Sequence, residues 1–225
     1  FQEFHKSLAR HGHTPLVLGN GQHGTYGGLG SKPRLLKAAI EKGLIKTDYV
    51  IFTDCWDVVF ASSPEDILEK YLHTHGHGDA PIVWNAEKNC FPNADLASQH
   101  PETESPFKYL NSGLAIGKTS DFYAALVEMK ADTIPDDHRG VDGKMVEPID
   151  QNNWMELLCG GATWMKLDNW CEFFQTLTEV GLHELSFKGK HIENVVTKSF
   201  PMVYHANGPS KENPVTKLIL NHLKL

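Results

Sequence analysis

The sequence predicts an α/β fold with a mostly parallel central sheet and a ligand site at the carboxyl ends of its strands. Short apolar runs typical of buried strands alternate with helical patterns, and the run Tyr49–Thr53 leads directly into two acids, Asp54 and Asp57. Ligands of open α/β sheets bind beyond the carboxyl ends of the strands. Because an unpaired buried carboxylate is costly, these acids are expected to face a cation or a proton-transfer reaction. The alternative is that one caps a turn and the other is solvated.

Length and composition are those of one globular domain spanning residues 1–225. The net charge of −7 provides no overall basic field, which disfavours non-specific nucleic-acid binding. The four cysteines lack metal-site spacing, so free thiols in a reducing, cytoplasmic setting are expected, with one disulfide or an endoplasmic reticulum lumenal setting as the alternative. No apolar run is long enough to span a bilayer.

The start of the chain predicts a helix over residues 1–10 that feeds a strand over Pro15–Leu18. This is the second half of a βαβ unit whose first strand would lie before Phe1, so the chain is expected to be trimmed at its amino end. A glycine-rich loop, residues 24–30, then leads through Ser31 as a helix cap into a helix containing Lys32 and ending near Gly43. Such a loop can bind phosphate through backbone N–H groups; a flexible connector is the alternative.

After the central strand, Ser63 caps a helix with Pro64 at its first position. This helix ends in alternating histidines, residues 73, 75 and 77, which suit a metal site but are more typical of a solvated helix end. A strand over Pro81–Trp84 delivers Glu87 to the same edge as Asp54 if the two strands are parallel, and the turn-rich residues 88–107 are expected to form a lid.

In the second half, the polar triplet Asn111-Ser-Gly opens an apolar strand, and a helix follows from about Ser120. Residues 135–148 are the best candidate for a mobile loop. Asp150 then sits where a new helix begins, so it is either a helix cap or a functional acid. Further on, the sequence predicts a strand over 164–167, a hairpin-like region to Lys198, a strand over 201–204 that ends at His205, and a short helix over 218–223.

Two carboxylates and one imidazole therefore converge at predicted strand ends: Asp54, Asp57 and His205. With positions left open for water and phosphate oxygens, this ligand set suits Mn²⁺ or Mg²⁺ better than zinc. A divalent ion beside lysines and backbone amides is what a diphosphate leaving group requires, because it offsets the charge that develops as the bond to the sugar breaks.

Five motifs in order resemble the glycosyltransferase domain of the procollagen lysyl hydroxylases, a family with relatives in viruses and phages. They are Thr53-Asp-Cys-Trp-Asp-Val58, Asn85-Ala-Glu87, Tyr109-Leu-Asn-Ser-Gly113, Asp150-Gln151 and His205-Ala-Asn-Gly-Pro-Ser-Lys211. The resemblance runs from the first helix to about Lys211. It implies a GT-A fold, a Rossmann-like α/β sandwich, that uses a UDP-sugar and Mn²⁺.

Carried over by position, the resemblance makes Asp54, Asp57 and His205 the metal ligands. Trp56 stands where the family stacks an aromatic ring on uracil. The remaining residues of the implied nucleotide site are Tyr26, Lys32, Asn207, Gly208 and Lys211.

On the sugar side, the predicted catalytic residues are Asp150, Gln151, Asn111 and Glu87. Asp150 matches one of two adjacent acids of the family, and Ile149 replaces the other. Phe91 or a neighbour stands in place of the family's lid tryptophan. These two differences from the family lie on the side of the site that binds the donor sugar and the acceptor, and they leave the metal and nucleotide residues unchanged.

The resulting expectation is a hexosyl- or pentosyltransferase that moves a sugar from a UDP-sugar to a hydroxyl group, with hydroxylysine in a protein as the acceptor implied by the family. A hydroxymethylated base of viral DNA is an alternative acceptor. A catalytically degenerate GT-A binding module and a nucleotide-sugar hydrolase are the competing function classes.

Overall fold

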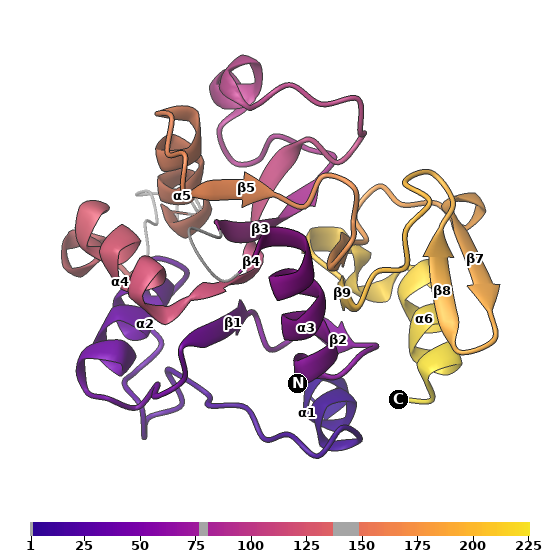
Figure 1. The fold of residues 1–225 in the computed structure, drawn as a ribbon, viewed down its shortest axis with the longest axis horizontal. Helices are drawn as coiled ribbons and strands as arrows, with labels where there is room; N and C mark the ends of the chain where they lie inside the picture. The colour runs from indigo at the N-terminus through magenta and orange to yellow at the C-terminus, as the bar shows by residue number, and fades with distance from the viewer. Residues whose placement is uncertain (1, 77–80, 137–148) are drawn as a thin grey trace, which may run out of the picture.

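The computed structural model describes residues 2–76, 81–136 and 149–225, with side chains from Asp150 onward in the last range. At its centre lies a four-stranded sheet in the order β1 (Tyr49–Thr53), β4 (Tyr109–Lys118), β3 (Ile82–Glu87) and β5 (Met165–Leu167) (Figure 1). β3 pairs parallel with β5, whereas β4 pairs antiparallel with both β1 and β3. Strands β1, β3 and β5 therefore run in the same direction, and β4 alone is reversed.

The reversed direction of β4 determines where the polar side chains meet. The beginning of β4 lies at the sheet edge where β1 and β3 end: Thr53 pairs with Leu114, and Asn85, the first residue after a bulge, pairs with Asn111. The expected polar triplet, Asn111 to Gly113, thus joins the acids that follow β1. β1 and β3 run in the same direction, so the condition for Glu87 to reach the same edge as Asp54 is met.

A second sheet of three short strands continues from this edge, in the order β2 (Val58–Phe60), β9 (Val203–His205) and β6 (Phe174–Thr176). β2 is antiparallel to β9, and Val58 pairs with His205. The expected hairpin forms between β7 (Leu185–Lys188) and β8 (His191–Asn194), beside α6 (Pro214–Leu223) on the right of Figure 1.

Helices cover both faces of the central sheet because successive residues of its strands point to opposite sides. Leu114 and Ile116 of β4 pack in the same cluster as α1 (Gln2–Ala9) and α3 (Pro64–His75). Ala115 packs with α2 (Ser31–Glu41), α4 (Thr119–Glu128) and α5 (Ile149–Cys159) on the other face. α6 packs in a third cluster with residues of the second sheet.

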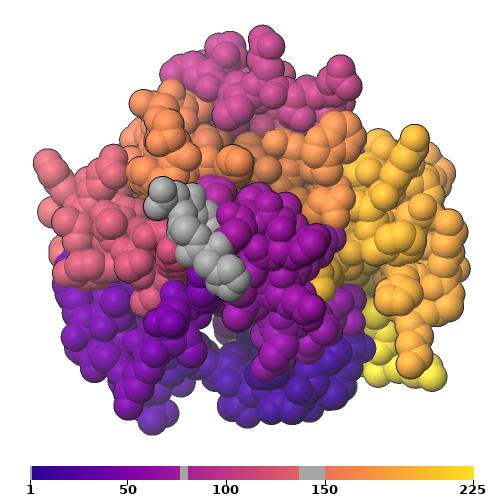
Figure 2. Space-filling view, viewed as in Figure 1, coloured from indigo at the N-terminus to yellow at the C-terminus, as the bar shows by residue number. Residues whose placement is uncertain are grey.

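Short 3₁₀ turns cover Ala94–Gln99, Ala131–Thr133, Leu182–Glu184 and Gly208–Glu212. In Figure 2 the amino-terminal segments form the lower part of the molecule and the carboxyl-terminal ones its right side.

The predicted cap of α3 is confirmed, whereas the predicted cap of α2 is wrong by one residue. Ser63 caps α3 in a reciprocal capping box with Asp66, as expected. At α2 the cap residue is Gly30 rather than Ser31. Ser31 is the first helical residue, and its hydroxyl donates to the Gly28 carbonyl at 2.6 Å, so it stabilises the preceding turn instead of the helix N–H groups.

The predicted strand over Pro15–Leu18 is wrong. α1 ends in a tight turn in which Gly12 and His13 donate to carbonyls of the helix, and residues 14–18 that follow belong to no strand. Pro15 has no N–H to donate, Leu16 is 43 % exposed, and Leu18 packs against the cluster that contains α2. The described residues therefore form no βαβ unit at the start of the chain.

Several expectations lie wholly or partly outside the described residues. Residues 137–148 of the expected mobile loop and His77 of the histidine run are among them.

All four cysteines are free thiols, in agreement with the expectation. No helix in the described ranges is long and apolar enough to cross a bilayer.

Candidate functional site

The two predicted metal acids lie on the loop between β1 and β2, which is tied to both sheets. The Asp54 N–H donates to the Gly113 carbonyl of β4 at 2.8 Å, and the Ala206 N–H donates to the Asp57 carbonyl at 2.7 Å. His205, the last residue of β9, points toward both carboxylates: its Nε2 lies 3.5 Å from Asp57 Oδ1 and 3.9 Å from Asp54 Oδ2. One ligand atom from each residue lies within 4.8 Å of the others. The predicted metal ligands thus form one cluster.

Gly113 makes room for the imidazole of His205. A Cβ atom at this position would lie 2.2 Å from Cε1 and 2.7 Å from Nδ1 of the ring. Any side chain on Gly113 would therefore push His205 away from the acids. The glycine of the Asn111-Ser-Gly triplet is required by this close approach rather than by its backbone conformation.

Asp57 is held as a carboxylate by its two cationic or polar neighbours. Burial alone would raise its pKa, but hydrogen bonds and charge from His205 and Lys211 outweigh burial and lower the pKa to about 2. Lys211 Nζ lies 3.1 Å from Asp57 Oδ2, and its side chain remains 55 % exposed. The acid is therefore ionised at neutral pH, the form that binds a cation.

Lys32, from the first turn of α2, joins Asp54 to Asp150. Its Nζ lies 3.0 Å from Asp54 Oδ1 and 2.6 Å from Asp150 Oδ2. Burial would lower the pKa of the ammonium group, but the two carboxylates outweigh burial and raise it. Lys32 is thus a mostly buried cation between the predicted metal site and the predicted catalytic acid.

Asp150 lies inside the first turn of α5, which begins at Ile149, so it is not the residue that caps this helix. Its side chain is buried and accepts a hydrogen bond from the Ser112 hydroxyl at 2.9 Å in addition to its ion pair with Lys32. The carboxylate is therefore directed toward β4 and α2, at the same sheet edge as Asp54.

Glu87, at the end of β3, connects the remaining predicted residues. Its Oε1 accepts from Asn111 Nδ2 at 3.1 Å and from Gln151 Nε2 at 2.9 Å, and its Oε2 accepts from Asn207 Nδ2 at 2.9 Å. Burial raises the pKa of Glu87, and the hydrogen bonds from these amides oppose that effect. One carboxylate thus links β4, α5 and the segment after β9.

Trp56 lies on the loop between the two metal acids and is 73 % exposed, so it is not a core residue. Together with Asp57 and Lys211 it borders a cavity of about 270 Å³ whose floor includes Val59, Leu177 and Tyr204. An exposed aromatic ring beside a charged pair and an apolar floor can receive a flat, partly polar ligand.

The other predicted nucleotide residues lie on two loops. Tyr26 is half exposed on the loop before α2. Gly208 opens a 3₁₀ turn with a φ of +56°, a left-handed conformation that favours glycine. The Oδ1 atom of Asn207 accepts from the N–H groups of Leu177 and Thr178 at 3.2 and 3.1 Å. The side chain of Asn207 therefore anchors its own loop.

The residues of this cluster fit a divalent cation. Within residues 2–76, 81–136 and 149–225, Asp54, Asp57 and His205 are the one group of three histidine, cysteine or acidic side chains close enough to share an ion. Hard oxygen ligands with one imidazole are a donor set suited to Mn²⁺ or Mg²⁺. The described histidines at the end of α3 form no such group.

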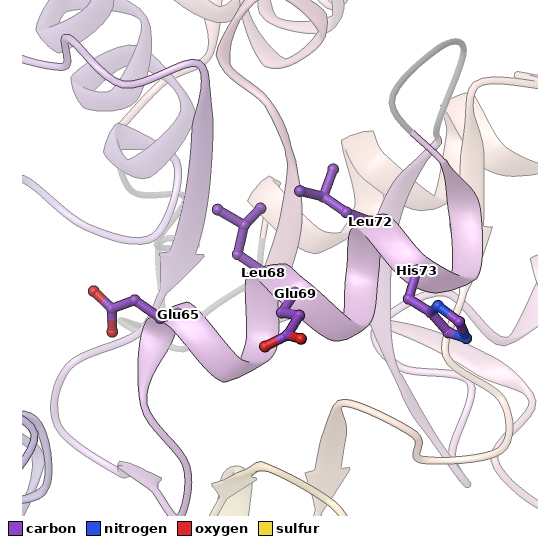
Figure 3. A pocket seen from close by; sticks show the side chains of 5 residues that line it. All are labelled: Glu65, Leu68, Glu69, Leu72 and His73. Atoms are coloured by element: carbon purple, nitrogen blue, oxygen red, sulfur yellow. The ribbon is translucent and has the colours of Figure 1, made fainter.

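A second cavity, of about 490 Å³, runs along α3 and is separate from these residues. Figure 3 shows Leu68 and Leu72 on one side of the helix, with Glu65, Glu69 and His73 along the other. Glu65 is hydrogen-bonded to His13 at 2.7 Å. This cavity contains none of the predicted site residues.

Sequence reasoning did not assign a role to Ser112 or Gly113, and it did not foresee that Lys32 joins two acids. The available signal was the polar triplet at the start of an otherwise apolar strand. Polar residues in a buried strand require partners, and the reversed direction of β4 supplies them.

Comparison with known proteins places the chain in a defined family. A model of the family described as the PLOD GT domain matches residues 1–224. Procollagen-lysine,2-oxoglutarate 5-dioxygenase 2 of Mus musculus is 31% identical over 233 residues, which cover 99% of this chain and 29% of the relative. The multifunctional procollagen lysine hydroxylase and glycosyltransferase LH3 of Rattus norvegicus is 31% identical, with 99% and 29% covered. Uncharacterized protein R699 of Acanthamoeba polyphaga mimivirus is 28% identical, with 98% and 44% covered. The chain thus spans less than half the length of each of these relatives.

Proposed function

Because the chain belongs to the PLOD GT domain family and has the mixed α/β architecture of a GT-A glycosyltransferase domain, we propose that it transfers a sugar from a UDP-sugar to a hydroxyl acceptor with a divalent metal ion. The observation that carries this proposal is the convergence of Asp54, Asp57 and His205 at one sheet edge, between two lysines and an exposed tryptophan.

Asp54, Asp57 and His205 would hold Mn²⁺, with Mg²⁺ as a substitute. The ion would offset the negative charge that develops on the diphosphate as it leaves. Lys32 pairs with Asp54, and Lys211 pairs with Asp57. The ammonium group of each lysine can donate hydrogen bonds to a diphosphate.

The nucleotide would lie against Trp56, with its diphosphate toward Lys211 and the backbone of Gly208. Uracil is flat and polar at its edge, so it suits the exposed ring of Trp56 and the cavity beside Asp57. Tyr26 remains a predicted contact of the same nucleotide.

Asp150 is the best candidate for the proton acceptor in the transfer step. The acceptor oxygen would form a bond to the anomeric carbon, the bond from that carbon to the diphosphate oxygen would break, and the hydroxyl proton would pass to the carboxylate of Asp150. Gln151 follows it on α5 and donates to Glu87 and to the Phe91 carbonyl. Gln151 thereby connects α5 to the segment predicted as a lid.

We favour hydroxylysine of a collagen-like peptide as the acceptor, because similar proteins carry procollagen lysine hydroxylase and glycosyltransferase in their names. The acceptor assay should also contain DNA with a hydroxymethylated base, since one similar protein is viral.

The test is to incubate the protein with a panel of UDP-sugars and Mn²⁺, with and without each acceptor, and to measure UDP release and acceptor mass. We expect one UDP-sugar to give acceptor-dependent UDP release. Asp54→Ala, Asp57→Ala and His205→Ala should each abolish it while leaving a folded domain, whereas Asp132→Ala, which removes a surface acid paired with Lys37, should not.

Other outcomes would assign another function. UDP release that no acceptor increases would indicate a nucleotide-sugar hydrolase. Metal-dependent UDP binding without release would indicate a binding module. A variant of one metal acid that keeps wild-type turnover at low Mn²⁺ would remove that residue from the ligand set.

A further inference from the structure

The amide of Asn111 has one possible orientation in its surroundings. Its Nδ2 lies 3.1 Å from Glu87 Oε1, and a carboxylate oxygen only accepts hydrogen bonds. Its Oδ1 lies 3.0 Å from the backbone N of Gly113, which only donates. Two independent partners on opposite ends of the amide therefore fix which end carries the oxygen.

This orientation dictates which nitrogen of His205 carries the proton. Nδ1 of His205 lies 3.1 Å from Asn111 Oδ1. Because that oxygen accepts, Nδ1 must donate, and in the neutral ring the lone pair is then on Nε2. Nε2 is the ring atom directed at the carboxylates of Asp57 and Asp54.

The rest of the pocket holds the ring in this position. His205 is 3 % exposed, and Gly113 packs so closely against its edge that no Cβ would fit between them. Glu87 is 5 % exposed, and both of its oxygens are occupied by amide donors from three other segments. Such a carboxylate orients its neighbours and has no described contact with the carboxylates of the metal site.

We propose that Asn111 and Glu87 are positioning residues: they keep a proton on Nδ1 of His205, so that Nε2, which faces Asp54 and Asp57, is the ring nitrogen left to bind a metal. The consequence for metal affinity rests on the proposed function, whereas the tautomer is a property of the protein alone. Partners of this kind, which bond the second nitrogen of a metal-binding histidine, orient its ring and set its tautomer.

The first test is nitrogen NMR of the metal-free protein labelled in its histidines, at a pH where His205 is neutral, with its signals assigned by their loss in His205→Gln. We expect the Nδ1-protonated tautomer for His205. A majority of the Nε2-protonated form would overturn the proposal. No metal, nucleotide or sugar is present, so this result is independent of the transferase assay.

The second test compares variants by the same spectrum and by Mn²⁺ binding, measured through the electron paramagnetic resonance of free Mn²⁺. Asn111→Leu removes the acceptor and should lose the tautomer preference and about 10- to 100-fold in Mn²⁺ affinity. Asn111→Asp keeps an acceptor at the same place and should retain the tautomer, although both variants lose the bond to Glu87. Equal spectra for the two variants would overturn the proposal.

Glu87→Leu removes one of the two restraints on Asn111 and should give a mixture of tautomers with a smaller loss of Mn²⁺ affinity. If both the tautomer and the affinity stay unchanged, Glu87 is not part of the arrangement. Asn194→Leu is the matched control: Asn194 is also buried and donates to another amide, that of Gln175, at 2.6 Å, and it has no described bond to His205 or Asn111. It should lower stability without changing the His205 spectrum.

Discussion

Trp56 shows what a single residue contributes to the proposed nucleotide site. Its ring is 73 % exposed on the loop between β1 and β2, in a position where it adds little to folding. Stacking of an aromatic side chain on a base contributes roughly 1–3 kcal/mol. We therefore expect Trp56→Ala to weaken UDP binding about 10- to 100-fold and to leave the melting temperature nearly unchanged, as measured by calorimetry of UDP binding and of unfolding.

Two comparisons make the Trp56 experiment decisive. Trp56→Phe keeps an aromatic face and should retain most of the affinity, whereas Trp170→Ala removes another exposed tryptophan, 46 % exposed, from a different loop. UDP affinity that falls equally in the Trp170 variant, or stays constant in Trp56→Ala, would remove Trp56 from the nucleotide site.

At this scale the sequence was informative about residue types but not about their partners. Asp54, Asp57 and His205 could be grouped because each follows or precedes an apolar run, and strand ends meet at one edge. The bonds of Lys32 to Asp54 and Asp150 could not be predicted, because they depend on how α2 and α5 pack across the sheet rather than on any spacing in the chain.

At the scale of elements, the direction of β4 explains most of the site. The sequence predicts the strand and its polar start, but a strand pattern does not reveal direction. Once β4 is reversed, Asn111, Ser112 and Gly113 all lie beside the ends of β1 and β3. The predicted strand over Pro15–Leu18 is wrong for a different reason. An apolar run predicts burial, but a strand also needs a backbone partner, and this segment has none among the described residues.

The start of α5 gives a test that separates a helix-stabilising from a catalytic role of Asp150. Because Asp150 lies inside the first turn and not at the cap, Asp150→Asn keeps the size of the side chain and gives up only its interaction with the helix dipole, but Asn cannot accept a proton or carry charge. We expect Asp150→Asn to retain UDP and Mn²⁺ binding and most of its stability, and to lower sugar transfer about 100-fold or more. The measurement is acceptor-dependent UDP release beside UDP affinity and melting temperature.

Asp150→Ser serves as the control, because Ser is shorter than Asn and cannot reach Lys32 in the same way. It should lose transfer as fully as Asp150→Asn. Transfer that remains at the wild-type rate in both variants would leave Asp150 a structural residue and would turn the search for a proton acceptor to Glu87.

The loop between β5 and β6 contains a buried acid whose titration should be visible in stability. Asp168 accepts hydrogen bonds from the N–H groups of Glu172, Phe173 and Phe174, each at 2.8 Å. Burial raises its pKa to about 6, although these three donors oppose the shift. A folded-state pKa above the unfolded value means that the folded protein binds the proton more tightly in this range.

The stability contributed by this group is therefore fully present below pH 4 and is lost as pH rises through 6. We expect the free energy of unfolding of the wild type, relative to Asp168→Asn, to fall by roughly 3 kcal/mol between pH 4 and 7. Urea unfolding at a series of pH values measures this difference. A difference that is flat or rises with pH would mean that the three N–H donors outweigh burial.

At the scale of the whole molecule, the site is assembled from segments that are far apart in the sequence. Lys32 comes from α2, Asp54 and Asp57 from the loop between the sheets, Asp150 from α5, and His205 from the end of β9. The sequence could indicate that each segment ends in a reactive side chain, but the balance of charge among them appears only in the folded chain. Three carboxylates face two lysines, and each lysine is already paired with an acid.

This balance predicts that a divalent cation and UDP bind cooperatively. Without the cation, an anionic diphosphate would meet three carboxylates and two lysines that are already engaged. When a cation neutralises Asp54 and Asp57, Lys32 and Lys211 are released from them and can donate to the diphosphate. We expect Mn²⁺ to increase UDP affinity at least tenfold, about 1.4 kcal/mol, and UDP to increase Mn²⁺ affinity by the same factor, because coupling between two binding sites is reciprocal.

Calorimetry of each ligand in the absence and presence of the other measures this coupling. Lys32→Met and Lys211→Met should each reduce the coupling factor, because they remove a charge that links the acids to the diphosphate. Lys70→Met is the matched control. Lys70, on α3, also pairs with an acid, Glu172, but neither residue belongs to the group of Asp54, Asp57 and His205. If the two ligands bind independently in the wild type, the lysines do not respond to the metal, and the diphosphate must be held by groups that are already free in the resting protein.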